Sequence, residues 1–570
     1  MSDETNARPP TAADAERIAQ LEERLARIEA HLGLAREASP APVEAATAPL
    51  VAAPSDPEPR TEDELEYQVG QSWFAVAGIA ALTIGGGFLI SLPFARLPAA
   101  APALAGYAVV IVLLGVAHIW RESFALVASH LRGAGMALLF ISTLRLFFPE
   151  AHHALDLASP AGRILLLGVV ALNFVLALRR KSPWLTGLAL VTGCAAVVVA
   201  GTAGFSLPLL VLLLAITLVA SQRFDWPVLE VAAVPIGFVT YLLWALGNPL
   251  RGGPVHFVAD PLAAPVVVLL CAVILAAGPW LRPREEREGP QPSISALLNC
   301  GLGFGVFLIH SAVAFRESVA PLHVAAFVVF LGLAVAFWVR QQSRVATFFY
   351  AMTGYAALSA AIFKASSVPA VFVWLSMQSV VVVATAIWFR SRFIVVANFL
   401  IYVCIVLGYV IVAERETGIS LGFGVVALVS ARILNWKKDR LELKTELMRN
   451  AYLVSAFLVF PYALAHLLPG KLVAVAWVGL ASGYYVLNFV VQNQKYRWMG
   501  HGTLLLTTVY VVIVGTSRFE PVYRVLSFLV LGTVLLTVSL VFTRIRKRAG
   551  EARRAEAAKE VPVAKRPAAG

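Results

Sequence analysis

The sequence has too few charged residues for a soluble protein. Of its 570 residues only 14% are charged and 59% are apolar, whereas roughly 25% of an ordinary soluble domain is charged. A water-soluble fold could not bury that many apolar side chains. The composition therefore excludes a soluble globular class and indicates that lipid surrounds much of the chain.

Cysteine is also scarce, with four residues that all fall inside apolar runs and none of which forms a close pair: Cys194, Cys271, Cys300 and Cys404. This excludes a disulfide framework, a haem attachment and a thiol redox motif. We interpret the four as small buried hydrophobes. They leave the redox compartment open, and neither a metal nor a cofactor is predicted.

Acidic groups and catalytic motifs are missing from the apolar runs. Glu230, Asp260, Lys364 and Glu414 lie at predicted span ends, where snorkelling or plain exposure explains them, and this weakens ion-coupled transport through buried carboxylates. The sequence shows no Walker loop, dinucleotide fingerprint or nucleophile elbow. Lys and Arg outnumber Asp and Glu by 46 to 34, but no basic stripe or zinc spacing predicts nucleic-acid binding. Enzyme activity is left open and is not favoured.

What the sequence has is a nearly unbroken series of apolar runs, each long enough to cross a bilayer. A crossing needs about 20 apolar residues. We count about eighteen runs, and they predict an all-α fold, a polytopic transmembrane helix bundle over residues 73–543, since helices satisfy their own backbone hydrogen bonds in lipid. The runs begin near residues 73, 99, 124, 163, 184, 206, 228, 261, 294, 319, 343, 367, 393, 418, 450, 470, 499 and 522.

The segment that precedes the first run predicts a short coiled coil and a linker. Heptad a and d positions over residues 1–35 are held by Ile18, Leu21, Leu25, Ile28 and Leu32, and the flanking charges would attract in a parallel homo-oligomer. A solitary amphipathic helix is the alternative, because this length is marginal. Residues 36–72, rich in Pro, Ala and Glu, predict a disordered linker. No cleavable signal peptide is recognisable.

The placement of the basic residues predicts the orientation. Alternate connectors are basic, as at Arg179–Lys181 and Arg390–Arg392, and the tail over residues 544–570 is basic as well. Lys and Arg favour cytoplasmic loops, so both termini are expected in the cytoplasm. Basic residues also recur just before spans that run outward, as at Lys181, Arg344 and Lys495. This rhythm suggests stacked helical hairpins.

Two arginines in the third run are candidates for ligand binding. Arg132 is expected about two turns inside the cytoplasmic face, and Arg145 lies at the far end of the same run. A planar guanidinium there could hold a lipid phosphate or a substrate carboxylate. The alternative is that the span begins near Gly133, so that Arg132 marks its edge while Arg145 snorkels outward.

Histidines and carboxylates supply the remaining candidates. The external connector over residues 150–156 contains Glu150, His152, His153 and Asp156, a set that could serve acid–base or metal chemistry. It lacks the helical His pair of zinc hydrolases, however, and a solvated loop is the alternative. His310, in the ninth run, could bind a ligand or shuttle protons, or it could be a hydrogen-bonded packing residue.

Two segments of the chain resemble a known family. They are Leu65 to Leu92, LEYQVGQSWFAVAGIAALTIGGGFLISL, and Leu131 to Phe147, LRGAGMALLFISTLRLF. They resemble a family of bacterial polytopic membrane proteins labelled domain of unknown function 2339, whose members share a coiled coil, a linker and an array of spans. The first span departs from the usual family pattern, which tends to end in a Lys-Tyr pair where this chain has Ser91, Leu92 and Pro93. The resemblance implies a bacterial inner membrane and brings no activity.

Three functions therefore remain open. The leading hypothesis is transport or handling of a lipid or small anionic solute, with the lipid bilayer as the main partner. The second is a scaffold that assembles partners through its coiled coil and basic tail. The third is an enzyme that modifies envelope glycans or lipids.

Overall fold

The computed structural model describes residues 74–91, 98, 100–147, 155–157, 159–249, 254–282, 290–412, 421–436 and 446–515, with scattered positions from 522 to 551. The chain divides into two compact units, residues 1–71 and 72–570. The first unit lies outside the described residues, and with it the predicted coiled coil and nearly all of the linker. The following account concerns the second unit.

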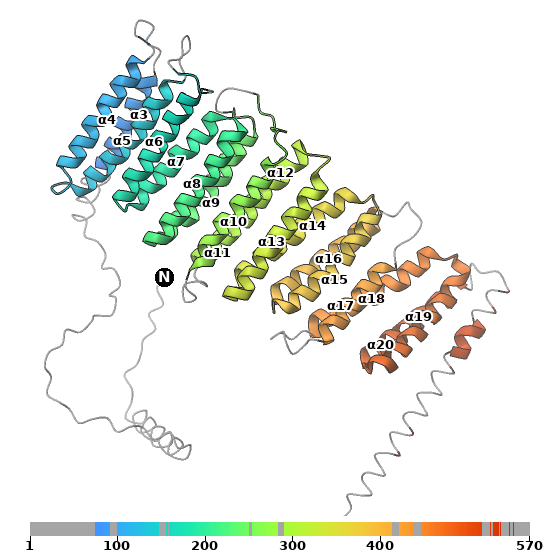
Figure 1. Cartoon of the computed structure of the whole chain (residues 1–570). Helices are drawn as coiled ribbons and strands as arrows, with labels where there is room; N and C mark the ends of the chain where they lie inside the picture. Colours follow the sequence, from blue (N-terminus) through green and yellow to red (C-terminus); the bar gives the residue numbers. More distant parts are fainter. Residues whose placement is uncertain are drawn as a thin grey trace, which may run out of the picture. The chain divides into compact units, whose positions relative to one another are not determined.

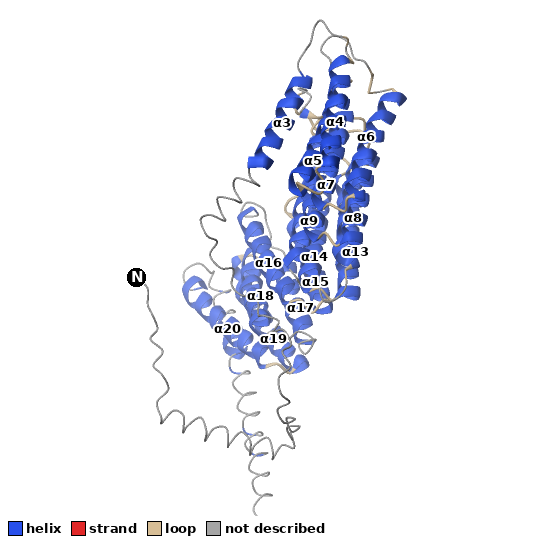
Figure 2. Ribbon diagram, turned by 90° about the vertical axis from the view of Figure 1, so that its left-hand side faces the viewer, coloured by secondary structure: helices blue, strands red, loops and turns tan. Residues whose placement is uncertain are grey.

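The described residues form helices, with no strand among them (Figures 1 and 2). The helices are α3 (Phe74–Ser91), α4 (Ala101–Ile119), α5 (Ala125–Arg145), α6 (Pro160–Arg179), α7 (Pro183–Ala200), α8 (Ala203–Phe224), α9 (Pro227–Ala245), α10 (Ala264–Leu281), α11 (Pro290–Leu298), the π-turn η4 (Asn299–Gly303), α12 (Phe304–Ala314), α13 (Val319–Gln341), α14 (Arg344–Ala365), α15 (Ala370–Trp388), α16 (Arg392–Val412), α17 (Gly422–Trp436), α18 (Glu446–Leu467), α19 (Gly470–Val491), α20 (Gln494–Tyr510) and the π-turn η7 (Val511–Gly515).

Each predicted run from 73 to 499 coincides with one of these helices, and the starts agree within five residues. The ninth run is a composite of α11, η4 and α12. Among the described residues, fifteen helices are long and apolar enough to cross a membrane. The predicted all-α polytopic fold is confirmed, and the chain is a multi-pass membrane protein. The run predicted from 522 falls largely outside the described residues.

Local sequence signals fix where several helices begin. The hydroxyls of Ser159, Ser182 and Ser343 accept hydrogen bonds from backbone N–H groups three residues later, and so cap α6, α7 and α14. Proline follows the first two of these serines, at the position where its missing N–H costs nothing. Serine caps therefore fix the first residue of these helices, after the long connector before α6 and after the short ones before α7 and α14.

A turn of two or three residues recurs at one end of the helices. We call this the basic end: it is where α6, α8, α13, α15 and α19 finish and the next helices start. In each turn a non-glycine residue adopts a left-handed conformation, with φ between 48° and 53°. These residues are Lys181, Asp225, Gln342, Arg390 and Gln492. The chain thus reverses within two or three residues, and this produces the helical hairpins that the spacing of basic residues suggests.

Packing within the unit is mostly between near neighbours along the chain. The hairpins α4–α5, α13–α14 and α19–α20 pack extensively, and helices two positions apart also touch, as α7 does with α9 and α8 with α10. Figure 1 shows these neighbours side by side. The main apolar core runs from Met136 in α5 to Met499 in α20. Burial within the core is deepest around α7–α10.

Candidate functional site

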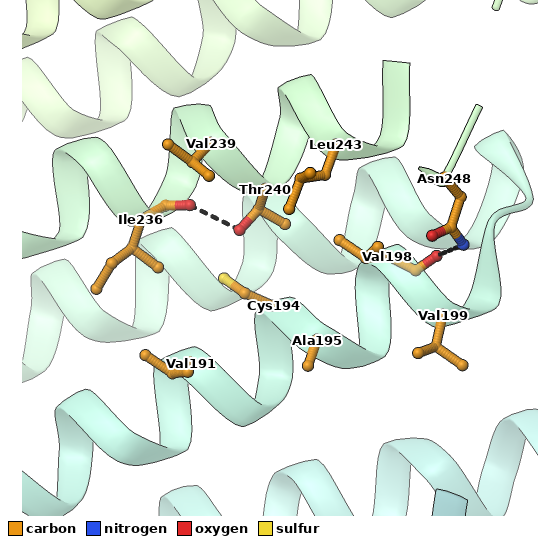
Figure 3. Close-up of a pocket in the computed structure, with 10 residues that line it drawn as sticks. All are labelled: Val191, Cys194, Ala195, Val198, Val199, Ile236, Val239, Thr240, Leu243 and Asn248. Carbon is orange, nitrogen blue, oxygen red and sulfur yellow. Dashed lines mark hydrogen bonds between the residues drawn. The ribbon is translucent and has the colours of Figure 1, made fainter. Parts of the chain in front are cut away.

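A groove between α7 and α9 forms the candidate site. Its volume is about 740 Å³, within the range of 300 to 1,000 Å³ that is usual for small-ligand pockets. Cys194, Ala195 and Thr240 are smaller than the side chains around them, so the helices leave space between their facing surfaces. The lining residues are Val191, Cys194, Ala195, Val198, Val199, Ile236, Val239, Thr240, Leu243 and Asn248 (Figure 3).

Asn248 is placed in the groove by the way α9 ends. The N–H of Gly247 donates to the carbonyl of Trp244, at 3.1 Å, and the N–H of Asn248 donates to that of Leu243, also at 3.1 Å. This pair of bonds is a Schellman motif with glycine at its left-handed position. Gly247 has φ of 74° and Asn248 has φ of 59°. The turn directs the Asn248 side chain back toward α7.

The side chain of Asn248 is buried, with 6% of its surface exposed. Its amide nitrogen donates to the carbonyl of Val198, in the last turn of α7 (Figure 3). Within the described residues its Oδ1 has no hydrogen-bond partner. The Thr240 hydroxyl donates to the carbonyl of Ile236 at 2.6 Å, and its side chain is also hydrogen-bonded to that of Cys194. The groove is therefore an aliphatic channel with one unused acceptor at the end where α7 and α9 finish.

His310 lies beside this region, in α12, and is fully buried. Its Nε2 is 2.8 Å from the carbonyl of Val258, and its Nδ1 is 2.8 Å from the hydroxyl of Tyr241. A carbonyl can only accept, so Nε2 carries the proton and Nδ1 accepts from the tyrosine. These bonds attach the connector after α9 to α9 and α12. Both ring nitrogens of this predicted site residue are thus occupied.

Arg132 lies seven residues after the start of α5, about two turns into the helix. The helix therefore begins before Gly133, and the point along α5 at which the membrane starts stays a prediction. The guanidinium donates from Nη2 to the carbonyl of Ala117, in the last turn of α4, at 2.9 Å. The positive charges of Arg121 and Arg180 lie near enough to repel the Arg132 guanidinium. Arg145 ends the same helix at its opposite end, so the two predicted arginines do not form one site.

We expect Arg132→Ala to lower the free energy of unfolding by about 1.5 kcal/mol. Hydrogen bonds to charged groups contribute about 1.5–3 kcal/mol when well shielded, and Arg132 is only half-buried, so the smaller value applies. Denaturant unfolding in mixed micelles measures it. Arg132→Lys, which keeps a donor, should lose less. Equal loss in both variants would contradict the role of the bond to Ala117.

The predicted external cluster is described only at Asp156. Glu150, His152 and His153 lie outside the described residues. Asp156 is exposed, and its backbone carbonyl accepts from the N–H and the hydroxyl of Ser159. Ser159 in turn caps α6. In the described part of this connector, the Asp156 backbone therefore helps to start a helix.

A buried ionic cluster at the basic end was not anticipated. Arg282 donates from Nη2 to Glu230 Oε2 at 3.0 Å, and Gln222 donates to the same oxygen at 2.9 Å. Gln222 also donates to the carbonyl of Gly278, at 3.2 Å, and Gln341 donates to that of Pro279, at 2.8 Å. The cluster joins α8, α9, α10 and α13. It satisfies C-terminal carbonyls of α10 that have no donor inside their own helix.

The expectation that Glu230 is exposed or snorkels is wrong, since only 5% of its surface is exposed. It does lie at a span end, in the first turn of α9. There the positive end of the α9 dipole favours a carboxylate, and the negative end of α10 favours Arg282. The sequence did contain a signal for this ion pair, because Glu230 lies in the first turn of α9 and the oppositely charged Arg282 directly follows α10. We refer to Glu230, Arg282, Gln222 and Gln341 as the Glu230 cluster.

Comparison of the chain with protein-family models, with curated proteins and with solved structures gave no match.

Proposed function

We propose that this multi-pass membrane protein handles lipid, and that it does so by holding the hydrocarbon chain of a bilayer lipid in the groove between α7 and α9. The single observation that carries the proposal is the groove itself, which is hollow, about 740 Å³ in volume and walled by aliphatic side chains. The helices around it are membrane spans by length and composition. In a bilayer, the groove would therefore open to lipid chains.

The dimensions support a chain segment as the occupant. The lining residues of α7 run from Val191 to Val199, which is about 12 Å of helix. The hydrocarbon core is about 30 Å thick, so the groove extends over less than half of it. These residues lie in the half of α7 that is farther from the basic end. The groove fits part of one acyl or prenyl chain from one leaflet.

We further propose that the basic end faces the cytoplasm of a bacterium, so that both termini are cytoplasmic and the groove opens in the outer leaflet of the inner membrane. The basic turns support this through the preference of Lys and Arg for cytoplasmic connectors. Exposed tryptophans at the same end are typical of a membrane interface. They are Trp120, Trp184, Trp388, Trp436 and Trp498. The resemblance to the bacterial membrane family points to the same compartment.

Filling the groove is the direct test. The full-length protein in nanodiscs is exposed to a phospholipid that carries a diazirine in one acyl chain, and crosslinked peptides are mapped by mass spectrometry. We expect labelling of residues 191–199 and 236–243 in the wild type. Ala195→Trp should lower it at least fivefold, because the indole would occupy the space a chain needs.

The matched control is Val219→Trp, which adds the same side chain to α8 at a residue that is 68% exposed and does not line the groove. In Val219→Trp the diazirine lipid should label the groove residues as strongly as in the wild type. Thermal stability of both variants checks that the fold is intact. Labelling of the groove that Ala195→Trp leaves unchanged would refute the proposal.

A further inference from the structure

The groove offers an occupant little hydrophobic gain. A chain that enters it leaves a bilayer that is already as apolar as leucine, so burial alone cannot favour one lipid over another. Preference must come from shape and from polar contacts. Asn248 has the one buried side chain in the groove lining whose acceptor atom lacks a partner among the described residues.

From this we infer that the groove selects a lipid that carries a neutral hydroxyl group near its chain, and that this hydroxyl donates a hydrogen bond to Asn248 Oδ1. The inference rests on the proposed function and names its substrate class: long-chain alcohols, prenols and glycerides with a free hydroxyl. An unsatisfied buried acceptor costs free energy, and a hydroxyl would remove that cost on binding.

Asn248 Oδ1 needs a hydrogen-bond donor as its partner, and this excludes most other headgroups from pairing with it. Oδ1 is a carbonyl oxygen and can only accept, while the amide nitrogen of Asn248 donates to the carbonyl of Val198. A phosphate or carboxylate also only accepts when ionised, so neither can pair with it. An ammonium would donate, but no acidic side chain lines the groove, and a desolvated charge without a counter-charge is costly. A neutral O–H donor is the group that remains.

The position of Asn248 suits such an anchor. It lies just beyond the end of α9, while Val191 and Ile236 lie deeper along the two helices. A chain that lies along the groove would therefore place its polar end at Asn248, nearer the membrane surface, and its methyl end toward the membrane centre. Figure 3 shows Asn248 at one end of the lining residues and Val191 at the other.

The experiment compares two probes, a diazirine-bearing hexadecanol and its methyl ether, each in nanodiscs with the full-length protein. The alcohol can donate a hydrogen bond and the ether cannot. We expect the alcohol to label residues 191–199 and 236–243 about fivefold more than the ether, the factor that one net hydrogen bond gives. Asn248→Gly should equalise the two probes. Glycine accepts the left-handed backbone at this position, so the turn is retained.

Asn173→Ala is the matched control. Asn173 is also buried with an unpartnered Oδ1, but it does not line the groove, so the preference for alcohol should persist. Equal labelling of the wild type by both probes would overturn the inference, and this result does not depend on any variant folding. If the two probes labelled the wild type equally but Ala195→Trp abolished labelling by each of them, the proposed function would stand and only the inferred preference for a hydroxyl would fall. If neither probe labelled the groove more than it labels the surface around Val219, the labelling would come from annular lipid only. This result would refute both the proposed function and the inferred preference for a hydroxyl.

Discussion

Glu230→Ala is expected to lower the free energy of unfolding by about 3–5 kcal/mol. Removal of one partner from a buried ion pair costs this much, because the remaining charge stays buried without compensation. Arg282 would lose its closest carboxylate and retain Asp225, whose carboxylate is 3.9 Å away and largely exposed. Gln222 would also lose its acceptor on α9. Denaturant unfolding in mixed micelles, followed by tryptophan fluorescence, measures the change.

The matched control is Glu122→Ala. Glu122 pairs with Arg121 at 3.0 Å, the same separation as in the buried pair, but both side chains are exposed. Exposed pairs contribute about 0–1 kcal/mol, so this variant should differ little from the wild type. The double variant Glu230→Gln with Arg282→Gln should recover much of the loss, since it leaves no unpaired charge. A loss below about 1 kcal/mol for Glu230→Ala would show that water enters the Glu230 cluster.

The second large effect is expected at Gly278, in the last turns of α10. A Cβ placed there would lie 2.6 Å from Glu230 Oε1, 2.7 Å from its Cδ and 2.8 Å from Leu218 Cδ1. Gly278→Ala must therefore displace the carboxylate from its bonds with Arg282 and Gln222. We expect a loss of about 2–3 kcal/mol, at the upper part of the usual cost of overpacking.

Gly168→Ala provides the comparison, because nothing lies within 4 Å of a Cβ at that helical position. There the better helix propensity of alanine should leave stability unchanged or raise it by up to about 1 kcal/mol. A double-mutant cycle then locates the strain. In the Glu230→Ala background, Gly278→Ala should cost clearly less than it does alone. Additive losses would show that the clash with Leu218, rather than with Glu230, dominates.

The spans could be predicted because their cause is local. A run of about 20 apolar residues is a property of consecutive positions, and a serine or proline at its start acts within one turn. The predicted starts consequently agree with α3 to α20 within five residues. The short turns at the basic end were signalled less directly, through the basic residues that recur beside them.

The Glu230 cluster and the groove could not be found in this way because their causes are not local. Glu230 and Arg282 are 52 residues apart, and either one alone is an ordinary charge at a span end. Asn248 follows a glycine after a span, as many connector residues do. Only the packing of α7 against α9 shows that its amide is buried and that Cys194 and Ala195 leave a hollow beside it.

The hairpin turns at the basic end have an evolutionary consequence. Contacts are mainly between elements close in sequence, as in soluble repeat proteins, so one hairpin's loss or duplication would disturb only the elements that flank it. Because a hairpin returns the chain to the side from which it started, such an event changes length by two crossings and leaves the direction of every downstream helix intact. Relatives of different size are then expected to differ by even numbers of crossings, with their breakpoints in the connectors that flank a hairpin, at the end opposite the basic end.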